Sequence, residues 1–294
     1  MFPLIFYPEV TMLQTDLRAI LAEARDVLAG AQVSPRRFFL LYLLLDAAMR
    51  LANYFANLSS ADSLLPFSNP AGMFVTVLVN LLTVVLGAGC CLYCLAIRQG
   101  ERAEFLTLFD GFSFVGRIIL VSLLQYSVAM LWSIPASLVM GLLLGSPAVV
   151  LAAPLLVLPL MAIYRYSFAL YNLCEDPDIG ILRALELSKR QTHGRLTALL
   201  LLDLRFLGWI ILAFLPTIAA FVINYMTLMG TPMPALPLPL SLALQLIFPV
   251  VVGVFYLPLR DTAKACLYAE AVRATGADPL ATGPDDLGGF PPLN

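Results

Sequence analysis

The distribution of lysine and arginine constrains this chain more than any other feature. All 17 basic residues lie outside three long stretches, residues 51–97, 118–164 and 206–259. These stretches are 47, 47 and 54 residues long, and one membrane-spanning helix needs roughly 20 apolar residues. Each stretch is therefore long enough to hold most of two spanning helices and the loop that joins them.

The composition requires lipid as the solvent for most of the chain. Hydrophobic residues make up 61% of the sequence and charged residues only 12%, whereas soluble domains carry about 25% charged residues. The net charge of −2 gives no basic excess for nucleic acid, so no nucleic-acid partner is expected. One histidine and scattered acidic residues predict neither a metal site nor a cofactor.

Positive residues collect on the cytosolic side of membrane proteins, so the basic clusters between the three stretches give the orientation. The sequence predicts an all-α, polytopic membrane bundle of about six helices in three hairpins, with both termini in the cytosol. The spans are expected near 38–57, 73–97, 114–143, 148–173, 196–225 and 239–259. The outer loops are expected at 58–72, 144–147 and 226–238.

Amphipathic segments flank the spans on the predicted cytosolic side. Residues 15–29 place apolar side chains on one helix face and end at Gly30, and residues 101–112 show a second such pattern that ends at Gly111. We therefore predict the following organisation: an N-terminal interfacial segment at 1–37, a transmembrane domain at 38–273 and a disordered cytosolic tail at 274–294.

Charged residues inside the spans are the candidate functional residues. Asp46 and Arg50 are four apart, which places them on one helix face within reach of each other. Charges at this depth are costly and face the bundle interior or a water-filled path. We therefore predict an intramembrane polar cluster. Its alternative is a set of ion pairs that only fixes helix packing. The members of the cluster are Asp46, Arg50, Arg165, Asp203 and Arg205.

A second group of basic residues is predicted to contact lipid head groups. Its members follow the fourth span in a short amphipathic segment and loop: Arg183, Lys189, Arg190 and Arg195. Basic clusters next to a span attract anionic lipids. The expected partners are therefore the lipid bilayer, anionic lipids within it, and an unidentified membrane protein.

The five cysteines are predicted to be reduced and free of metal. Cys91 and Cys94 form a C-x-x-C pattern, but the pattern lies in an apolar helix with no second ligand pair nearby. Small buried residues are the favoured interpretation. Gly87 and Gly89 on the same helix are expected to allow a close contact with a neighbouring helix.

A weak repeat supports three hairpins that enter the membrane from the same side. The returning helices share a leucine–tyrosine pair, at Leu92–Tyr93, Leu170–Tyr171 and Leu267–Tyr268. Parallel repeats of this kind occur in many membrane proteins.

A set of single residues and short motifs is spread over most of residues 15–270. Its members are Gly100–Glu101, Phe109–Asp110–Gly111–Phe112, Tyr166, Tyr171, Asp176–Pro177, Ala184, Ser188, Gly194, Leu202–Asp203–Leu204, Phe206–Leu207–Gly208–Trp209, Pro258, Ala263 and Tyr268. Together they resemble DUF975, a family of bacterial membrane proteins of unknown function, and Arg205 stands where the family pattern has a small polar residue. The resemblance implies a bacterial integral membrane protein of about six helices and supplies no activity.

No sequence signature of catalysis is visible, so the chain is predicted not to be an enzyme. The favoured function is a non-enzymatic organiser or regulator at the cytosolic face of the bacterial cytoplasmic membrane. The alternative is a transporter or channel-like protein for a small solute or ion, and a lipid-modifying enzyme is a more distant one. A polar cavity that reaches the middle of the membrane would favour transport, and a closed bundle would favour the organiser.

Overall fold

The computed structural model describes residues 9–58, 69–143, 157–228, 237–276 and 279. Within these ranges the chain is almost entirely helical and contains no β-strand, which confirms the predicted all-α fold. Residues 277–278 and 280–294, most of the predicted tail, lie outside the described residues, as do large parts of the three predicted outer loops.

Five of the described helices are long and apolar enough to cross a membrane. The predicted count of six is not tested, because the fourth span, at 148–173, begins outside the described residues. Its remainder consists of α6 (Val157–Arg165), a turn, and α7 (Ala169–Glu175). The five long helices are α2 (Pro35–Asn57), α3 (Pro70–Gln99), α5 (Val115–Leu143), α9 (Leu196–Leu228) and α10 (Leu238–Thr275).

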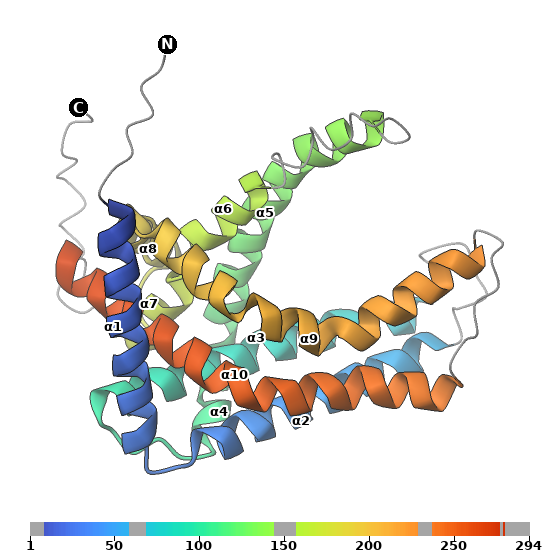
Figure 1. Cartoon of the computed structure of the whole chain (residues 1–294), viewed down its shortest axis with the longest axis horizontal. Coiled ribbons are helices and arrows are strands. Elements are labelled where there is room, and N and C mark those ends of the chain that lie inside the picture. The colour runs from blue at the N-terminus through green and yellow to red at the C-terminus, as the bar shows by residue number, and fades with distance from the viewer. Residues whose placement is uncertain (1–8, 59–68, 144–156, 229–236, 277–278, 280–294) are drawn as a thin grey trace.

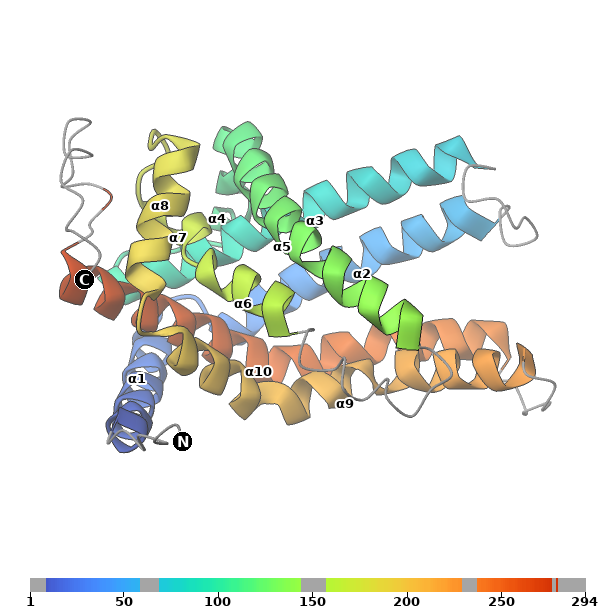
Figure 2. The same ribbon diagram turned by 90° about the horizontal axis from the view of Figure 1, so that it is seen from above.

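The helices of the spans pair in chain order as hairpins. Helix α2 packs on α3, α5 on α6, and α9 on α10. The first and third hairpins lie side by side through contacts of α10 with α2 and α3, while the α5–α6 hairpin leaves the others at a slant (Figure 1, Figure 2).

Additional helices precede each hairpin and gather at one end of the molecule, which we call the packed end (Figure 1). They are α1 (Glu9–Gly30), α4 (Thr107–Asp110) with the 3₁₀ helix η2 (Gly111–Phe114), and α8 (Ile181–Thr192). Helix α1 packs on α10, α4 on α3 and α8 on α7. Each of these helices therefore covers the returning helix of one hairpin, which gives the packed end a cyclic arrangement.

The second amphipathic helix is shorter than the sequence indicated. Only four residues of the predicted segment 101–112 form α-helix, and the chain then continues as the 3₁₀ helix η2. The backbone here lies directly on α3, because a side-chain carbon at Gly89 would overlap the carbonyl oxygen of Leu108. The close contact predicted at Gly89 is therefore present, whereas an added carbon at Gly87 would meet nothing within 4 Å.

Helix α10 extends well past the predicted end of the sixth span at residue 259. It continues through Pro258 to Thr275 and ends at Gly276, whose φ of 61° is left-handed. Proline within a helix removes one backbone hydrogen bond. The extension offsets that loss because it buries Ala263, Leu267 and Tyr268 in the core of the packed end.

Candidate functional site

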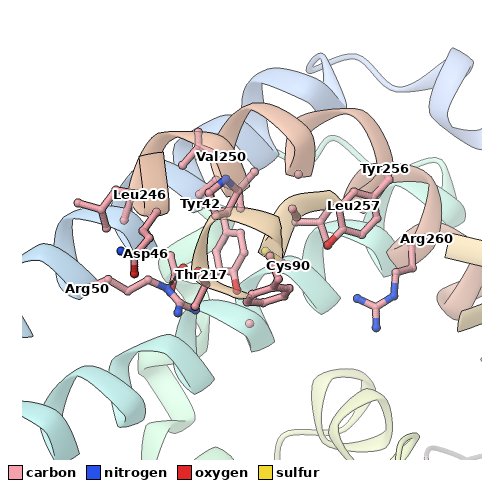
Figure 3. A pocket seen from close by; sticks show the side chains of 18 of the residues that line it. Tyr42, Asp46, Arg50, Cys90, Thr217, Leu246, Val250, Tyr256, Leu257 and Arg260 are labelled. Carbon is pink, nitrogen blue, oxygen red and sulfur yellow. Dashed lines mark hydrogen bonds and ion pairs between the residues drawn. The ribbon is translucent and has the colours of Figure 1, made fainter. Parts of the chain in front are cut away.

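A cavity of about 260 Å³ lies between the first and third hairpins and is lined by α2, α3, α9 and α10. Its lining combines apolar side chains with nine titratable or polar ones: Tyr42, Asp46, Arg50, Cys90, Thr217, Gln245, Tyr256, Arg260 and Asp261. Figure 3 shows Asp46 and Arg50 at one end and Arg260 at the other, with Tyr42 and Cys90 between them.

Asp46 and Arg50 form the ion pair that their spacing predicts. Arg50 Nε donates to Asp46 Oδ2 at 2.6 Å, and Thr83 Oγ1 donates to Asp46 Oδ1 at 3.4 Å. Asp46 lies nine residues beyond Arg37, which corresponds to about 13 Å along the helix axis. If Arg37 marks the membrane surface, this end of the cavity is close to the middle of a hydrocarbon core about 30 Å thick.

Asp203 forms the centre of a second charged group, the Asp203 cluster, which consists of Tyr164, Asp203, Arg260 and Lys264. Asp203 accepts from Arg260 Nε at 2.8 Å and from Tyr164 OH at 2.8 Å, and Lys264 Nζ lies 3.1 Å from Asp203 Oδ1. These side chains come from α6, α9 and α10. The cluster therefore ties the second hairpin to the third.

Arg260 connects the two groups, since it binds Asp203 and also lines the cavity. Its Nη1 lies 3.8 Å from Asp261 Oδ1, so Asp261 is held only loosely. The charged lining of the cavity comprises two cations, Arg50 and Arg260, and two anions, Asp46 and Asp261. Its formal charge therefore sums to zero.

Two features of α10 shape the wall of the cavity. An added carbon at Gly253 would lie 2.8 Å from Leu43 Cδ1, so the absence of a side chain allows α10 to approach α2 closely. Pro249 lacks the N–H that a helix would offer to the carbonyl group four residues earlier, that of Gln245. Both residues line the cavity.

One comparison with known proteins identifies the chain. The model of a family described as "Protein of unknown function (DUF975)" matches residues 12–273. The chain belongs to the DUF975 family. No curated protein and no solved structure matches it. All residues of the cavity and of the Asp203 cluster lie inside the range matched by DUF975, so both are built from the shared part of the chain.

Two of the five residues predicted for the polar cluster lie elsewhere in this DUF975 chain. Arg165 and Arg205 are exposed, and no ion pair among the described residues joins them to Asp203. Arg165 ends α6, where its backbone carbonyl accepts hydrogen bonds from Ser188 and Thr192. Arg205 is two residues from Asp203 and so points to a different side of α9.

The four basic residues predicted to contact head groups differ in their contacts. Arg190 pairs with Glu186 at 2.8 Å, and Arg195 with Glu270 at 3.4 Å. Lys189 is exposed and Arg183 is half-buried. Contact with lipid stays a prediction for all four.

The sequence did not single out the residues that α10 contributes to the cavity and to the Asp203 cluster. Arg260 lines the cavity and Lys264 contacts Asp203, but in the sequence both are simply basic residues that follow the stretch 206–259. Their spacing of four residues places both on one face of the helix. Gln245 offered a further signal, since it is an amide within a long apolar run. No sequence pattern distinguishes the remaining cavity residues from other helix residues: Tyr42, Cys90, Tyr256 and Asp261.

Proposed function

We propose that this DUF975 protein binds a small polar solute in the cavity between its first and third hairpins and carries it across the membrane. One observation carries the proposal: a hollow with two arginines and two aspartates in its lining lies within the span helices. Charged groups are expensive in a bilayer and mark substrate or ion paths. The proposal includes no chemical reaction.

The lining favours a solute that is zwitterionic or neutral. A site with equal numbers of positive and negative side chains offers no net attraction to a simple cation or anion. A zwitterion can place its negative group near Arg260 and its positive group near Asp46, or the reverse. The volume of about 260 Å³ is also smaller than the roughly 300–1,000 Å³ of pockets for drug-sized ligands, which suits a solute of amino-acid size.

A binding screen followed by a transport assay tests the proposal. Purified protein is melted in detergent with small zwitterionic amino acids, betaine, neutral polyols, simple cations or simple anions. A solute at 100 times its Kd stabilises the folded protein by about 2.7 kcal/mol. We expect stabilisation by a zwitterion or a neutral polar solute, and uptake of that solute into proteoliposomes.

The matched variants are Gln245→Leu, which changes the cavity lining, and Gln125→Leu, which changes a half-buried amide on α5 that lies outside the cavity. We expect Gln245→Leu to weaken both stabilisation and uptake, and Gln125→Leu to leave them unchanged. Stabilisation by none of the solutes, or equal losses in the two variants, would contradict the proposal.

The organiser function remains a second candidate because apolar side chains are exposed at the packed end. On α4 and η2 these are Phe109 and Phe112, and on α8 Leu182 is 76% exposed. Such residues bind a membrane surface or a partner protein. Capture of one specific membrane protein by the wild type, lost in Phe109→Ser/Phe112→Ser but retained in Gln245→Leu, would support the organiser.

We also propose that the packed end faces the cytosol of a bacterial cell, with both termini on that side of the cytoplasmic membrane. The charge distribution supports this orientation. A reporter fused after Leu64, in a predicted outer loop, should be active outside the cytosol. One inserted after the exposed Gly100 should be active inside. The opposite result at either position would overturn the orientation.

A further inference from the structure

A second hollow lies at the packed end, where α1 runs across α10 and the chain turns into α2 (Figure 1). This groove has a volume of about 440 Å³ and shares no residue with the intramembrane cavity. Three segments line it: α1 with Arg25, the start of α2 with Ser34 and Arg36, and α10 with Val254, Phe255 and Leu259.

The α10 side of the groove is apolar and belongs to the membrane-spanning part of that helix. Phe255 is 60% exposed although it is a large aromatic residue. Val254 and Leu259 extend the same apolar strip along the helix. In a bilayer this strip lies against hydrocarbon, so it fits an acyl chain better than a polar ligand.

The other side of the groove is positively charged. Arg25 and Arg36 are both exposed, and neither forms an ion pair with any described residue. Ser34 precedes α2 and its hydroxyl makes no capping hydrogen bond, so it is available to a ligand beside the positive end of the helix. Among the described residues that line the groove there is no acidic side chain.

We propose that this groove binds one anionic phospholipid from the leaflet at the packed end. The phosphate group contacts Arg25 and Arg36 and one acyl chain lies along Phe255. Two arginines without acidic neighbours in the lining select a net negative head group over a zwitterionic one. The bound lipid fills the angle between α1 and α10 and so holds the surface helix against the spanning helix.

Native mass spectrometry of the full chain in a neutral detergent measures the binding of single lipid molecules directly. Phosphatidylglycerol and phosphatidylcholine with the same acyl chains are titrated into the wild-type protein. We expect one phosphatidylglycerol to bind on the order of 20-fold more tightly than phosphatidylcholine, since each arginine near a lipid surface strengthens anion binding about fivefold. Equal binding of the two lipids would overturn the proposal without any variant.

Charge-matched variants locate the site. Arg25→Gln/Arg36→Gln removes the two groove arginines, and Arg18→Gln/Arg37→Gln removes two exposed arginines of the same helices that do not line the groove. We expect the first double variant to lose most of the preference for phosphatidylglycerol and the second to keep it. Equal losses would show a diffuse surface effect and overturn the assignment.

Two further measurements concern the acyl chain. Soluble glycerol phosphate should not displace the lipid, because it lacks the chain that contacts α10. Phe255→Asp places a charge on the apolar strip and should weaken phosphatidylglycerol binding even though both arginines remain. Displacement by glycerol phosphate, or unchanged binding in Phe255→Asp, would contradict a lipid ligand. Neither experiment uses a transported solute, so the result is independent of the function proposed for the cavity.

Discussion

The ends of the hairpins that lie opposite the packed end are called the distal end. Helices at the packed end and helices at the distal end are held together by different contacts. In α2 the buried residues end at Leu43, and in α9 they end at Ala213. In α10 none of the described residues before Val250 is buried. The packed end, by contrast, contains nearly all of the buried aromatic and amide side chains of the described chain, among them Phe38, Tyr93, Phe168, Asn172, Gln191 and Tyr268.

The difference follows from the solvent around each part. Lipid tails are as apolar as leucine, so distal side chains gain little by packing on each other rather than on lipid. Polar contacts make up for this at the tip of the first hairpin, where Thr76 Oγ1 donates to Asn53 Oδ1 at 2.7 Å and Asn69 Nδ2 to the Ala56 carbonyl at 2.8 Å. The distal end is thus joined by a few hydrogen bonds, and the packed end by a continuous core.

Aromatic contacts join helices within that core, both inside the first hairpin and between the second and third hairpins. Tyr93 stacks on Phe38 with ring centroids 3.8 Å apart, and its hydroxyl donates to the Val33 carbonyl at 2.9 Å. Tyr171 stacks on Tyr268 at 5.3 Å. The three tyrosines of the predicted leucine–tyrosine repeat therefore all lie in aromatic pairs at the packed end.

A buried amide network completes the packed end. Asn172 and Gln191 exchange two side-chain hydrogen bonds, at 3.0 and 2.8 Å, and Asn172 also donates to the Ala184 carbonyl at 3.2 Å. Tyr268 OH contacts Asn172 Oδ1 at 2.9 Å and Glu175 Oε2 at 2.7 Å.

The largest effect is expected for Asn172→Leu. The change leaves the Gln191 amide and the Ala184 carbonyl without the partner that Asn172 provides, and each such loss costs about 1–3 kcal/mol. We expect the free energy of unfolding, measured by titration with a denaturing detergent, to fall by about 3 kcal/mol.

The matched control is Asn80→Leu, at the distal end. Asn80 is exposed and donates only to the Thr76 carbonyl of its own helix. We expect a change within about 0.5 kcal/mol, as for most surface substitutions. Similar losses of unfolding free energy for Asn172→Leu and Asn80→Leu would show that the packed end does not depend on buried contacts more than the distal end does.

Asp203→Ala should have the next largest effect, because it leaves Arg260 and Lys264 without the carboxylate that both contact. Breaking a fully buried pair costs about 3–5 kcal/mol. Since these side chains are 14–24% exposed, we expect about 2–3 kcal/mol.

Asp178→Ala is the control for this charge. Asp178 also accepts from an arginine, Arg117, at 2.8 Å, but its side chain is 93% exposed. Exposed ion pairs contribute about 0–1 kcal/mol. A loss in Asp178→Ala as large as that in Asp203→Ala would contradict the structural role assigned to the Asp203 cluster.

The sequence predicted the features that depend on local pattern. The long apolar helices, the amphipathic helix before the first span and the Asp46–Arg50 pair all follow from periodicity or from a spacing of four residues. The features that were missed depend on contacts between distant segments. Asp203 and Arg260 are 57 residues apart, and Asn172 and Tyr268 are 96 apart. Neither pairing can be deduced from one sequence, because many side chains are equally suitable as partners.

A smaller effect is expected at the ion pair in the cavity. The Arg50 side chain is 58% exposed, whereas that of Arg260 is 24% exposed. The Arg50 charge is therefore better solvated, and its stabilisation depends less on its aspartate partner. We expect Asp46→Ala to cost about 1 kcal/mol, and the double variant Asp46→Ala/Arg50→Ala to cost less than the sum of the single changes. Additive losses would show that the two residues do not interact. If the cavity binds a solute, the double variant should fold but lose the stabilisation by that solute.

The smallest effect is expected for apolar residues on the outer side of α5. Leu131 is 67% exposed, so it faces lipid if no other protein covers it. Leu131→Ala then replaces one apolar contact with lipid by another, and we expect a loss below about 0.5 kcal/mol in bicelles. A loss above about 1 kcal/mol would indicate that the side chain is buried against something other than lipid.

Repeating the measurement at several protein-to-lipid ratios identifies the cause, because a contact between two protein chains weakens on dilution in lipid and a contact within one chain does not. A dilution-dependent loss would mean that the distal end is completed by a partner protein, and the comparison between the two ends would then apply only to the isolated chain.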